Sequence, residues 1–445
     1  MAHNANLSEQ RLNILKHIAV LRSLNVSQQD IAKRLGLSQS AVSKFIQQAL
    51  RLDLLRQGPL VTNFDDADKI VGELLGTEEL EKRLLELKER DGWAILPKIH
   101  VSYASRYREP TQRQEEEGQA MRQWDEAVVR WGKAVAKPIC ALLSRSNTIG
   151  ICWGRQIRSV VDGIQALGPE RIPVEVAPMW GQRLTLQPEP DDAVFTDHLR
   201  LSCNRLAADL ATALNHSNIN RYKYYMPVFD LIPINEYIVR LNDTRISEAA
   251  LKEHMRNPDL GGKFDEEGNV KFPGELRETL ESIEAYRLVF GPQDDSFVRR
   301  MEVVIASVGA GGRRAFGTGE SDNYGNIPLK WLRDCALGDI GGILLLKPSD
   351  KLPKGRDKTV VRWQFEQIRR HWTGVRIEHL KSCAIRADRE GRPGVIVLAV
   401  GARRAEVTLA CMKQGLINHL FSDNMHAQEL KKLVESELHA VRGHR

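Results

Sequence analysis

The sequence predicts a two-part protein of the α/β class: a small all-α unit at the N-terminus and a large domain built on a doubly wound, mostly parallel sheet. Residues 1–62 contain short amphipathic helical segments separated by turn residues. The rest of the 445-residue chain alternates short apolar runs with helical stretches, the pattern of strand-helix-strand units. A chain of this length also exceeds one ordinary core, so at least two domains are expected.

The composition is that of a globular protein, with 42% hydrophobic and 27% charged residues. No apolar run approaches the ~20 residues of a membrane helix, and the N-terminus lacks the apolar core of a signal peptide. We therefore expect a cytoplasmic protein that makes no use of a membrane. The six cysteines lie far apart without a CxxC pair, which argues against zinc or a redox motif and favours reduced, buried thiols.

Basic charge is concentrated at the N-terminus. Residues 1–62 hold eight Lys or Arg against three Asp or Glu, which is +5 of the chain's net charge of +6. Phosphate neutralisation gives sequence-independent affinity for nucleic acid, so a basic segment on a near-neutral body suits a nucleic-acid-binding module. The alternative is an ordinary solvated surface.

Three helices are expected in this basic segment. Ser8 is placed to cap the first helix, whose apolar residues recur at helical spacing over residues 12–22. Ser27 is placed to cap the second helix, Gln28–Leu35.

A tight turn should join the second helix to the third. Gly36 permits the left-handed backbone of such a turn, and Leu37 fills the angle between the helices. Ser38 is placed to cap the third helix, which we expect to run to about Leu50 or Leu52.

Helix, tight turn and helix together make a helix-turn-helix motif, and the outer face of its third helix is polar. Amide, hydroxyl and ammonium groups on that face can bind base edges or phosphates in a major groove about one helix wide. A generic helical hairpin could carry the same pattern, but it would not explain the local charge. The residues expected to contact double-stranded operator DNA are Ser38, Gln39, Ser40, Ser43, Lys44 and Gln47.

Two further features follow the motif. Residues 52–62 are expected to form a strand or short wing with a Gly58-Pro59 turn, which would lie over backbone phosphates. Thr77 is placed to cap an amphipathic helix that runs through Arg90. We interpret this helix as a linker or a dimer element.

The large domain shows the strand-helix rhythm most clearly. A long helix is expected over 121–143, and strands are expected at 94–101, 148–153, 174–178, 222–228, 303–309, 340–346 and 394–400. In a doubly wound parallel sheet the ligand site lies beyond the carboxyl ends of the strands. The loops at those ends are therefore where a site is expected.

Three of these loops combine glycine with arginine. Glycines let backbone N–H groups face an anion, and guanidinium groups bind phosphate oxygens in pairs, so converging loops would make a phosphate site. Each loop alone is explained equally well as a tight turn. No dinucleotide fingerprint or P-loop is present, and no cofactor is expected. The loops are Cys152-Trp153-Gly154-Arg155-Gln156, Gly309-Ala310-Gly311-Gly312-Arg313-Arg314 and Gly401-Ala402-Arg403-Arg404.

Over nearly its whole length the chain resembles the SorC-type sugar-binding transcriptional regulators. The most specific similar segments are Trp153-Gly154-Arg155 and VIVLAVGARRAEVTLACMKQGLINHLFSDNMHAQEL at 395–430. The others are the helix-turn-helix at 8–52, IGICWGRQI at 149–157, VEVAPMWG at 174–181, NRLAADLA at 204–211, YYMPV at 224–228, VVIASVGAGG at 303–312 and CALGDIGG at 335–342.

The resemblance implies a sugar-phosphate-isomerase-like sensor domain without catalysis, a phosphorylated sugar as effector, and a homo-oligomer on paired DNA half-sites. We place the DNA-binding domain at 1–62, a linker and helix at 63–90 and the effector-binding domain at 91–445. Amphipathic helices at 77–90 and 121–143 favour a dimer or tetramer. The effector site is expected at Trp153, Gly154, Arg155, Gln156, Gly309, Ala310, Gly311, Asp339, Gly401 and Arg404.

The chain also departs from the family pattern. Cys152 and Gln156 stand where the family usually has a small residue and a Thr, so a hydroxyl contact to phosphate is lost. Arg404 stands where the family usually has a Lys, which keeps the charge but not the shape. Additional segments at about 183–197, 233–290 and 347–372 point to an unusual effector. The alternative for Arg155 and Arg404 is that both are surface residues paired with nearby acids.

The rival function is a sugar-phosphate isomerase-like enzyme with an appended DNA-binding domain. Such an enzyme needs a general base and acid at the same strand ends, and Asp322, Asp339 and Asp423 are the candidates. Asp339 could equally well cap a helix or hold a loop. The histidines show no HxxxH or HExxH spacing, so no metal is expected; those considered are His198, His216 and His419. We therefore expect a regulator that is not an enzyme.

Overall fold

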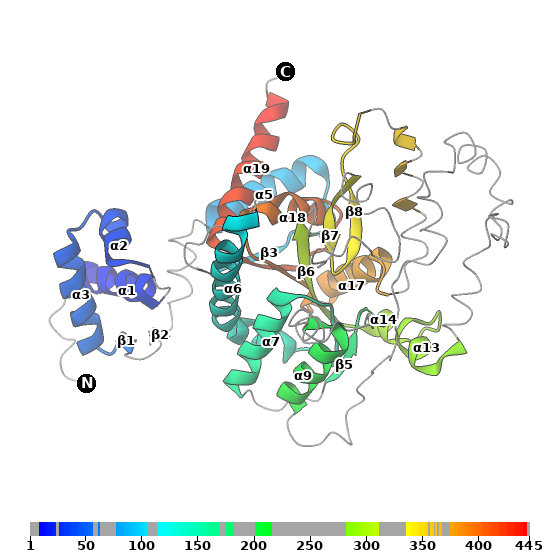
Figure 1. Ribbon diagram of the computed structural model, residues 1–445, viewed down its shortest axis with the longest axis horizontal. Helices are drawn as coiled ribbons and strands as arrows, with labels where there is room; N and C mark the ends of the chain where they lie inside the picture. The colour runs from blue at the N-terminus through cyan, green and yellow to red at the C-terminus, as the bar shows by residue number, and fades with distance from the viewer. Residues whose placement is uncertain are drawn as a thin grey trace.

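The computed structural model contains two separate hydrophobic cores (Figure 1). The structure describes residues 9–23, 26–56, 61–62, 77–102, 104, 114–168, 174–180, 201–215, 282–310, 335–354, 357–359, 361–362, 365–366 and 374–442. The small core lies between Leu15 and Leu55, and the large core extends from Leu80 to Val434. The large unit is built on a mostly parallel sheet, so the predicted α/β class is confirmed.

Three helices form the small unit: α1 (Glu9–Ser23), α2 (Gln28–Leu35) and α3 (Gln39–Arg51). Both predicted caps are confirmed within the described residues. The Ser27 hydroxyl accepts the Asp30 N–H at 3.1 Å, and the Ser38 hydroxyl accepts the Ala41 N–H at 3.2 Å. Gly36 has a φ of 63°, the left-handed backbone that the tight turn requires. Ser8 lies outside the described residues.

The helices bury one apolar stripe. Val42, Ile46 and Ala49 of α3 recur at helical spacing and pack in the same core as Leu15 and Ile18 of α1. Two short antiparallel strands follow, β1 (Leu55–Arg56) and β2 (Val61–Thr62), which fits the short wing of the two predicted alternatives better than a single strand. The Gly58-Pro59 turn between them lies outside the described residues.

The main sheet has the strand order β3-β10-β9-β6-β4-β5, and every neighbouring pair on this path is parallel. Its strands agree with the predicted apolar runs within a few residues, except that the sequence analysis did not predict β10. The run at 222–228 lies outside the described residues. The strands are β3 (Lys98–Ser102), β4 (Thr148–Ile151), β5 (Glu175–Pro178), β6 (Val303–Ala310), β9 (Gly394–Ala399) and β10 (His419–Asp423).

The direction of winding reverses between β4 and β6. From β4 the chain moves to β5 on one side, and it later returns to β6 on the other side before adding β9 and β10. In open α/β sheets, ligands bind at the carboxyl ends of the strands where this reversal occurs. The loops after β4 and β9 and the end of β6 therefore flank that point.

The run at 340–346 was wrongly predicted to be one strand. It contains the end of β7 (Ala336–Ile340), a two-residue turn and β8 (Ile343–Leu346), which pair antiparallel. Gly341 and Gly342 have φ values of 57° and 91°, which a tight hairpin turn needs and a strand forbids. Since β7 also pairs antiparallel with β6, opposite Gly309 and Ala310, those two residues lie in a strand instead of the predicted loop.

Helices surround the sheet, with α6 beside α7 and α5 beside α19 in Figure 1. Thr77 was expected to cap α5; it is instead the first helical residue, and its hydroxyl has no hydrogen-bond partner among the described residues. The helices are α5 (Thr77–Asp91), α6 (Gln114–Leu143), α7 (Arg155–Leu167), α9 (Cys203–Asn215), α13 (Glu284–Phe290), α14 (Phe297–Arg300), α17 (Ile377–Glu390), α18 (Ala405–Lys413) and α19 (Asn424–Arg442), with a 3-10 turn η3 (Ala402–Arg404).

The apolar faces of α5 and α6 are buried inside the large unit. Leu80, Leu84 and Leu87 of α5 belong to the large core, as do Trp131 and Ile139 of α6. These residues are covered by the chain itself, whereas Leu85 of α5 and Val129 of α6 are exposed, and the oligomer expected from these helices stays a prediction. Within the described residues no helix combines the length and the apolar character needed to cross a membrane.

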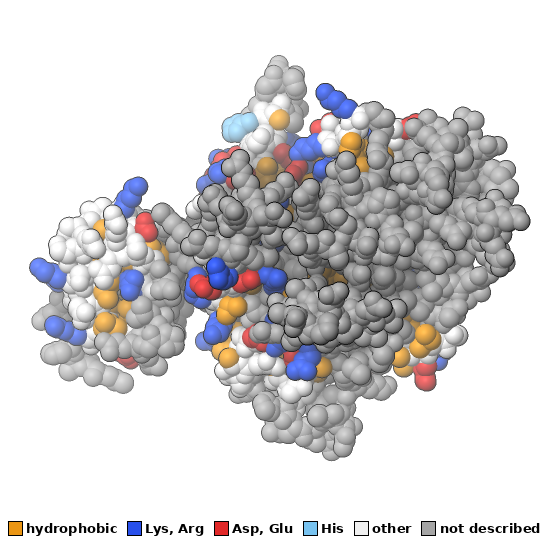
Figure 2. Space-filling model, in the orientation of Figure 1, with side chains coloured by type: hydrophobic (Ala, Val, Ile, Leu, Met, Phe, Trp, Pro, Cys, Tyr) orange, Lys and Arg blue, Asp and Glu red, His pale blue; other side chains and the backbone are white. Residues whose placement is uncertain are grey.

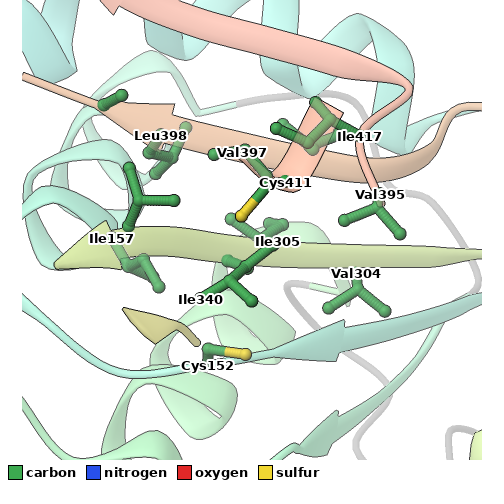
Figure 3. Close-up of a cluster of buried hydrophobic side chains, with 14 of the residues drawn as sticks. Cys152, Ile157, Val304, Ile305, Ile340, Val395, Val397, Leu398, Cys411 and Ile417 are labelled. Atoms are coloured by element: carbon green, nitrogen blue, oxygen red, sulfur yellow. The ribbon is translucent and has the colours of Figure 1, made fainter. Parts of the chain in front are cut away.

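All six cysteines are buried and none forms a disulfide with another, as predicted. Figure 3 shows Cys152, Ile305 and Cys411 in one apolar cluster, which joins the end of β4, the middle of β6 and α18. The backbone at Gly341 packs closely against this cluster, because a Cβ added there would lie 2.6 Å from the sulfur of Cys152.

We expect Gly341→Ala to destabilise the chain more than Gly391→Ala. Both positions have positive φ, 57° and 66°, but an added Cβ at Gly391 meets nothing within 4 Å. The strained backbone alone should cost about 1 kcal/mol, and the contact with Cys152 should raise the loss at Gly341 to about 2–4 kcal/mol. Urea unfolding of both variants measures the difference, and equal losses would contradict the close approach.

Candidate functional site

The structure brings the predicted glycine segments to one edge of the sheet. β4, β6 and β9 are neighbours and run in parallel, so their carboxyl ends lie side by side. Trp153 and Gly154 follow β4, Gly309 and Ala310 end β6, and Gly401 follows β9. Gly311 lies outside the described residues.

The two loop glycines already use their backbone N–H groups within the chain. Gly154 and Gly401 have φ values of 124° and 104°, which favour glycine. The Gly154 N–H donates to the Leu201 carbonyl at 3.4 Å, and the Gly401 N–H donates to Oδ1 of Asp423 at 3.0 Å. In this conformation these two groups therefore do not form the expected anion cradle.

Arg404 lies at the end of η3, half-buried against α6. Its Nη1 donates to the Val400 carbonyl at 2.8 Å. The guanidinium carbon is 5.0 Å from the centre of the Trp124 ring, in the range of a cation–π contact. The charge is thus held near the carboxyl end of β9, and its expected role in binding phosphate stays a prediction.

Gln156, near the start of α7, holds Arg404 from the other side. The side chain is only 4% exposed. With its amide oriented to satisfy both groups, Nε2 donates to the Leu398 carbonyl at 2.7 Å and the oxygen accepts from Nε of Arg404 at 3.1 Å. This amide therefore ties α7 to β9 and positions the arginine.

Arg155 is paired with an acid. Its Nη1 lies 2.8 Å and 2.9 Å from the two carboxylate oxygens of Asp125 on α6, and the pair is more than a third exposed. For Arg155 this matches the alternative of a surface ion pair. Because Asp125 adjoins Trp124, the two arginines flank the same turn of α6 without sharing a partner there.

Asp339 is a buried carboxyl at this edge, 5% exposed, and it holds the turn between β7 and β8 by accepting the Gly342 N–H at 2.9 Å. Burial raises the pKa of Asp339 to about 7, and the Gly342 N–H and the positive charge of Arg404 oppose this rise. The charge of Asp339 also raises the pKa of the Cys152 and Cys411 thiols, although their burial is the larger cause.

Aromatic rings line the same region, and most of them were not singled out from the sequence. Trp153 and Trp180 have ring centres 5.1 Å apart, and a Cβ at Gly342 would lie within 3.6 Å of both rings. Trp124 was missed because it looks like an ordinary apolar residue of a helix. Trp180 lies two residues after the end of β5, and this position after a strand was the available signal.

The carboxyl end of β10 is fixed by a buried polar group. Oδ1 of Asp423 accepts the N–H groups of Gly401 and His426, both at 3.0 Å, so this candidate acid anchors two main-chain segments. Nε2 of His426 contacts the Thr408 hydroxyl at 2.9 Å. Burial and the charge of Arg404 lower the pKa of His426 to about 3.

Of the other candidate acids and bases, His419 is the one that lies within the described residues. His419 begins β10, at the amino edge of the sheet, where its Nδ1 lies 3.0 Å from Nε2 of His100. Asp322, His198 and His216 lie outside the described residues.

On the small unit, Gln39, Ser40, Lys44 and Gln47 are exposed and Ser43 is half-buried. Ser38 is occupied as the cap of α3, and its hydroxyl lies 3.0 Å from the Ser40 hydroxyl. Figure 2 shows Lys and Arg side chains spread over the visible surface of this unit. The face therefore offers amides and ammonium groups more than free hydroxyls.

We expect Asp339→Asn to gain stability relative to the parent chain as the pH rises. The folded pKa is about 7, while an unfolded Asp titrates near ~3.9. The folded chain thus keeps a proton that the unfolded chain releases, so stability present below about pH 4 is lost towards pH 7, by roughly 1 kcal/mol per pH unit. Asn stays neutral and can still accept the Gly342 N–H.

Urea unfolding near pH 5 and near pH 8, followed by tryptophan fluorescence, measures this difference. Every tryptophan lies at position 93 or beyond, so the signal reports on the large domain. His100, His419 and His426, whose pKa values are lowered, are present in both chains and cancel in the comparison. A stability difference that does not change with pH would show that Asp339 is charged in the folded chain.

Gln156→Leu should cost about 1–3 kcal/mol of folding stability, because it leaves the Leu398 carbonyl and Nε of Arg404 without this partner. Gln165→Leu on the same helix is the matched control. That side chain is exposed and donates once, to the Asp209 carbonyl at 3.3 Å, so we expect a change below about 0.5 kcal/mol. Equal losses of stability for the two variants in thermal or urea unfolding would contradict the hydrogen bonds that we assign to Gln156.

No family model and no curated protein matches this chain. Solved structures do. The sorbitol operon regulator SorC from Klebsiella pneumoniae is 15% identical with a TM-score of 0.43, covering 95% of this chain and 100% of that one. A DeoR family transcriptional regulator from Listeria monocytogenes is 18% identical with a TM-score of 0.39, covering 80% and 99%. A transcriptional regulator from Streptococcus pneumoniae is 10% identical with a TM-score of 0.46, covering 80% and 98%. The solved structures similar to this chain are transcriptional regulators, SorC- and DeoR-family proteins among them.

Proposed function

We propose that this chain is a DNA-binding transcriptional regulator of the SorC type, whose affinity for operator DNA is controlled by a phosphorylated sugar or a related metabolite. The observation that carries the proposal is the placement of Arg404. It lies where three parallel strand ends meet beside the reversal of winding, in a unit whose core is separate from that of the helix-turn-helix.

The small unit has the features of a DNA-binding domain. Its α2–Gly36–α3 geometry is that of a helix-turn-helix, and the exposed face of α3 carries Gln39, Lys44 and Gln47. The excess of basic residues supplies affinity for the phosphate backbone. A single short helix reads few base pairs, which favours a dimer or tetramer on paired half-sites.

The large unit suits an anionic, hydroxyl-bearing ligand. Arg404 supplies a partly buried positive charge, and α7 begins beside it with no side-chain cap at Gly154. Nε1 of Trp124 and Nδ1 of His426 are buried and have no hydrogen-bond partner among the described residues. The first is a donor and the second can accept, so sugar hydroxyls could satisfy both.

The same residues favour a sensor over the rival isomerase. Asp339 and Asp423 each accept backbone N–H groups and so support turns and helix ends. A general acid or base would need to face a substrate instead. We therefore propose that both carboxyls shape the pocket without catalysing a reaction in it.

Arg404→Ala tests the proposal, with the adjacent exposed Arg403→Ala as its control. Removing the arginine leaves the ligand's partly desolvated phosphate without its charged partner, so the binding free energy of the ligand should become weaker by about 2–5 kcal/mol. Arg403→Ala should have little effect, and Arg155→Ala an intermediate one because Arg155 already pairs with Asp125. Thermal shift against a panel of phosphorylated sugars identifies the ligand and ranks the variants.

DNA binding is measured on the same proteins, with a duplex that the full chain selects from a randomised pool. Arg404→Ala should bind this duplex like the parent chain and lose the response to the ligand. If Arg404→Ala responds at the parent's ligand concentration, the site assignment is wrong. If the parent chain selects no DNA sequence, the proposed function as a DNA-binding regulator is wrong.

A further inference from the structure

Helix α3 presents two opposite stripes. Val42, Ile46 and Ala49 form the buried one, and the residues opposite them point to solvent. That exposed stripe and its flank carry Gln39, Ser40, Lys44, Gln47 and Arg51. Their side chains are the groups that a partner of α3 would meet first.

Several polar groups on or near this face are already engaged. The Ser38 hydroxyl accepts the Ala41 N–H, and the Ser40 hydroxyl lies 3.0 Å from it. The Gln48 side-chain oxygen accepts from Nη2 of Arg11 at 3.2 Å. These contacts hold Ser40 and Gln48 in place and leave them less able to contact bases.

Two carboxamides remain at the surface. Gln39 and Gln47 are exposed, and within the described part of the chain neither side chain makes a hydrogen bond. A carboxamide offers a donor and an acceptor side by side, which matches the N6 and N7 edge of adenine in the major groove. Guanine presents two acceptors there and is matched by Arg or Lys.

We propose that Gln39 and Gln47 each bind an adenine, so that every half-site carries two A·T pairs at a fixed spacing. This inference rests on the proposed DNA-binding function. The two residues are eight positions apart on one helix, a rise of about 12 Å at 1.5 Å per residue. Stacked bases are about 3.4 Å apart, so the two A·T pairs should lie at most about three to four base pairs apart along the duplex.

Duplex DNA is the partner that fits this face. Lys33 of α2 and Lys44 and Arg51 of α3 are exposed, and Asp30 and Asp53 are the acids nearest in sequence to the two glutamines. A phosphate backbone complements that charge. The major groove of double-stranded RNA is too deep and narrow for a helix, so an RNA duplex of the same sequence should compete poorly.

The test is selection from randomised duplex DNA by the full chain, repeated with Gln39→Ala, Gln47→Ala and Gln47→Glu. The parent should select A·T at two positions. Each alanine variant should lose about tenfold preference at one position and keep the other. Gln47→Glu should shift its position towards cytosine, whose N4 amino group donates to a carboxylate.

Gln48→Ala is the matched control, because it is the same residue type one position along and is held by Arg11. It should leave the selected sequence unchanged. A selected sequence without the two A·T positions, or one that survives both alanine changes, overturns the inference while the DNA-binding function stands. Selection of no sequence, or equal competition by RNA, overturns the proposed function and the inference with it.

Discussion

The parallel pairing of β4, β6 and β9 is the constraint on which the large domain depends. Because neighbouring parallel strands end at the same edge, the start of α7 and the loop after β9 come within hydrogen-bond distance across β6. Gln156 can then accept from Arg404 while donating to the Leu398 carbonyl. The hairpin of β7 and β8 completes the edge by placing Asp339 opposite Gly309. One sheet register thus gathers a cation, a buried carboxyl and a pair of tryptophans that are far apart in the sequence.

The features that were predicted correctly depend on residues close together in the chain. Ser27, Gly36 and Ser38 act through backbone groups three or four positions away, so their residue types alone indicate where α2 and α3 begin and turn. The apolar runs that became β4, β6 and β9 are buried on both faces, and continuous apolar runs are the pattern of such strands.

The features that were missed depend on contacts between distant segments or on local geometry that several patterns share. Strand β10 has a short apolar stretch between His419 and Asp423, too little to signal a strand, and it is stabilised by pairing with β3 and β9 on both sides. Gly341 and Gly342 interrupt an apolar run that otherwise looks continuous. No sequence pattern could show that Arg155 would pair with Asp125 while Arg404 turned towards Trp124 and Gln156. The partners that the two arginines contact depend on how α6 packs against α7.

A ligand at the Arg404 edge can change DNA binding only through a difference in its affinity for two states of the whole chain. That coupling is reciprocal: the factor by which the ligand changes operator affinity equals the factor by which the operator changes ligand affinity. Titrating the phosphorylated sugar with and without bound operator, and the operator with and without the sugar, measures both factors. We expect equal factors, each about 5- to 150-fold and each lost in Arg404→Ala. A ligand that binds the parent chain with the same affinity in the presence and absence of operator would contradict the regulatory role assigned to this site.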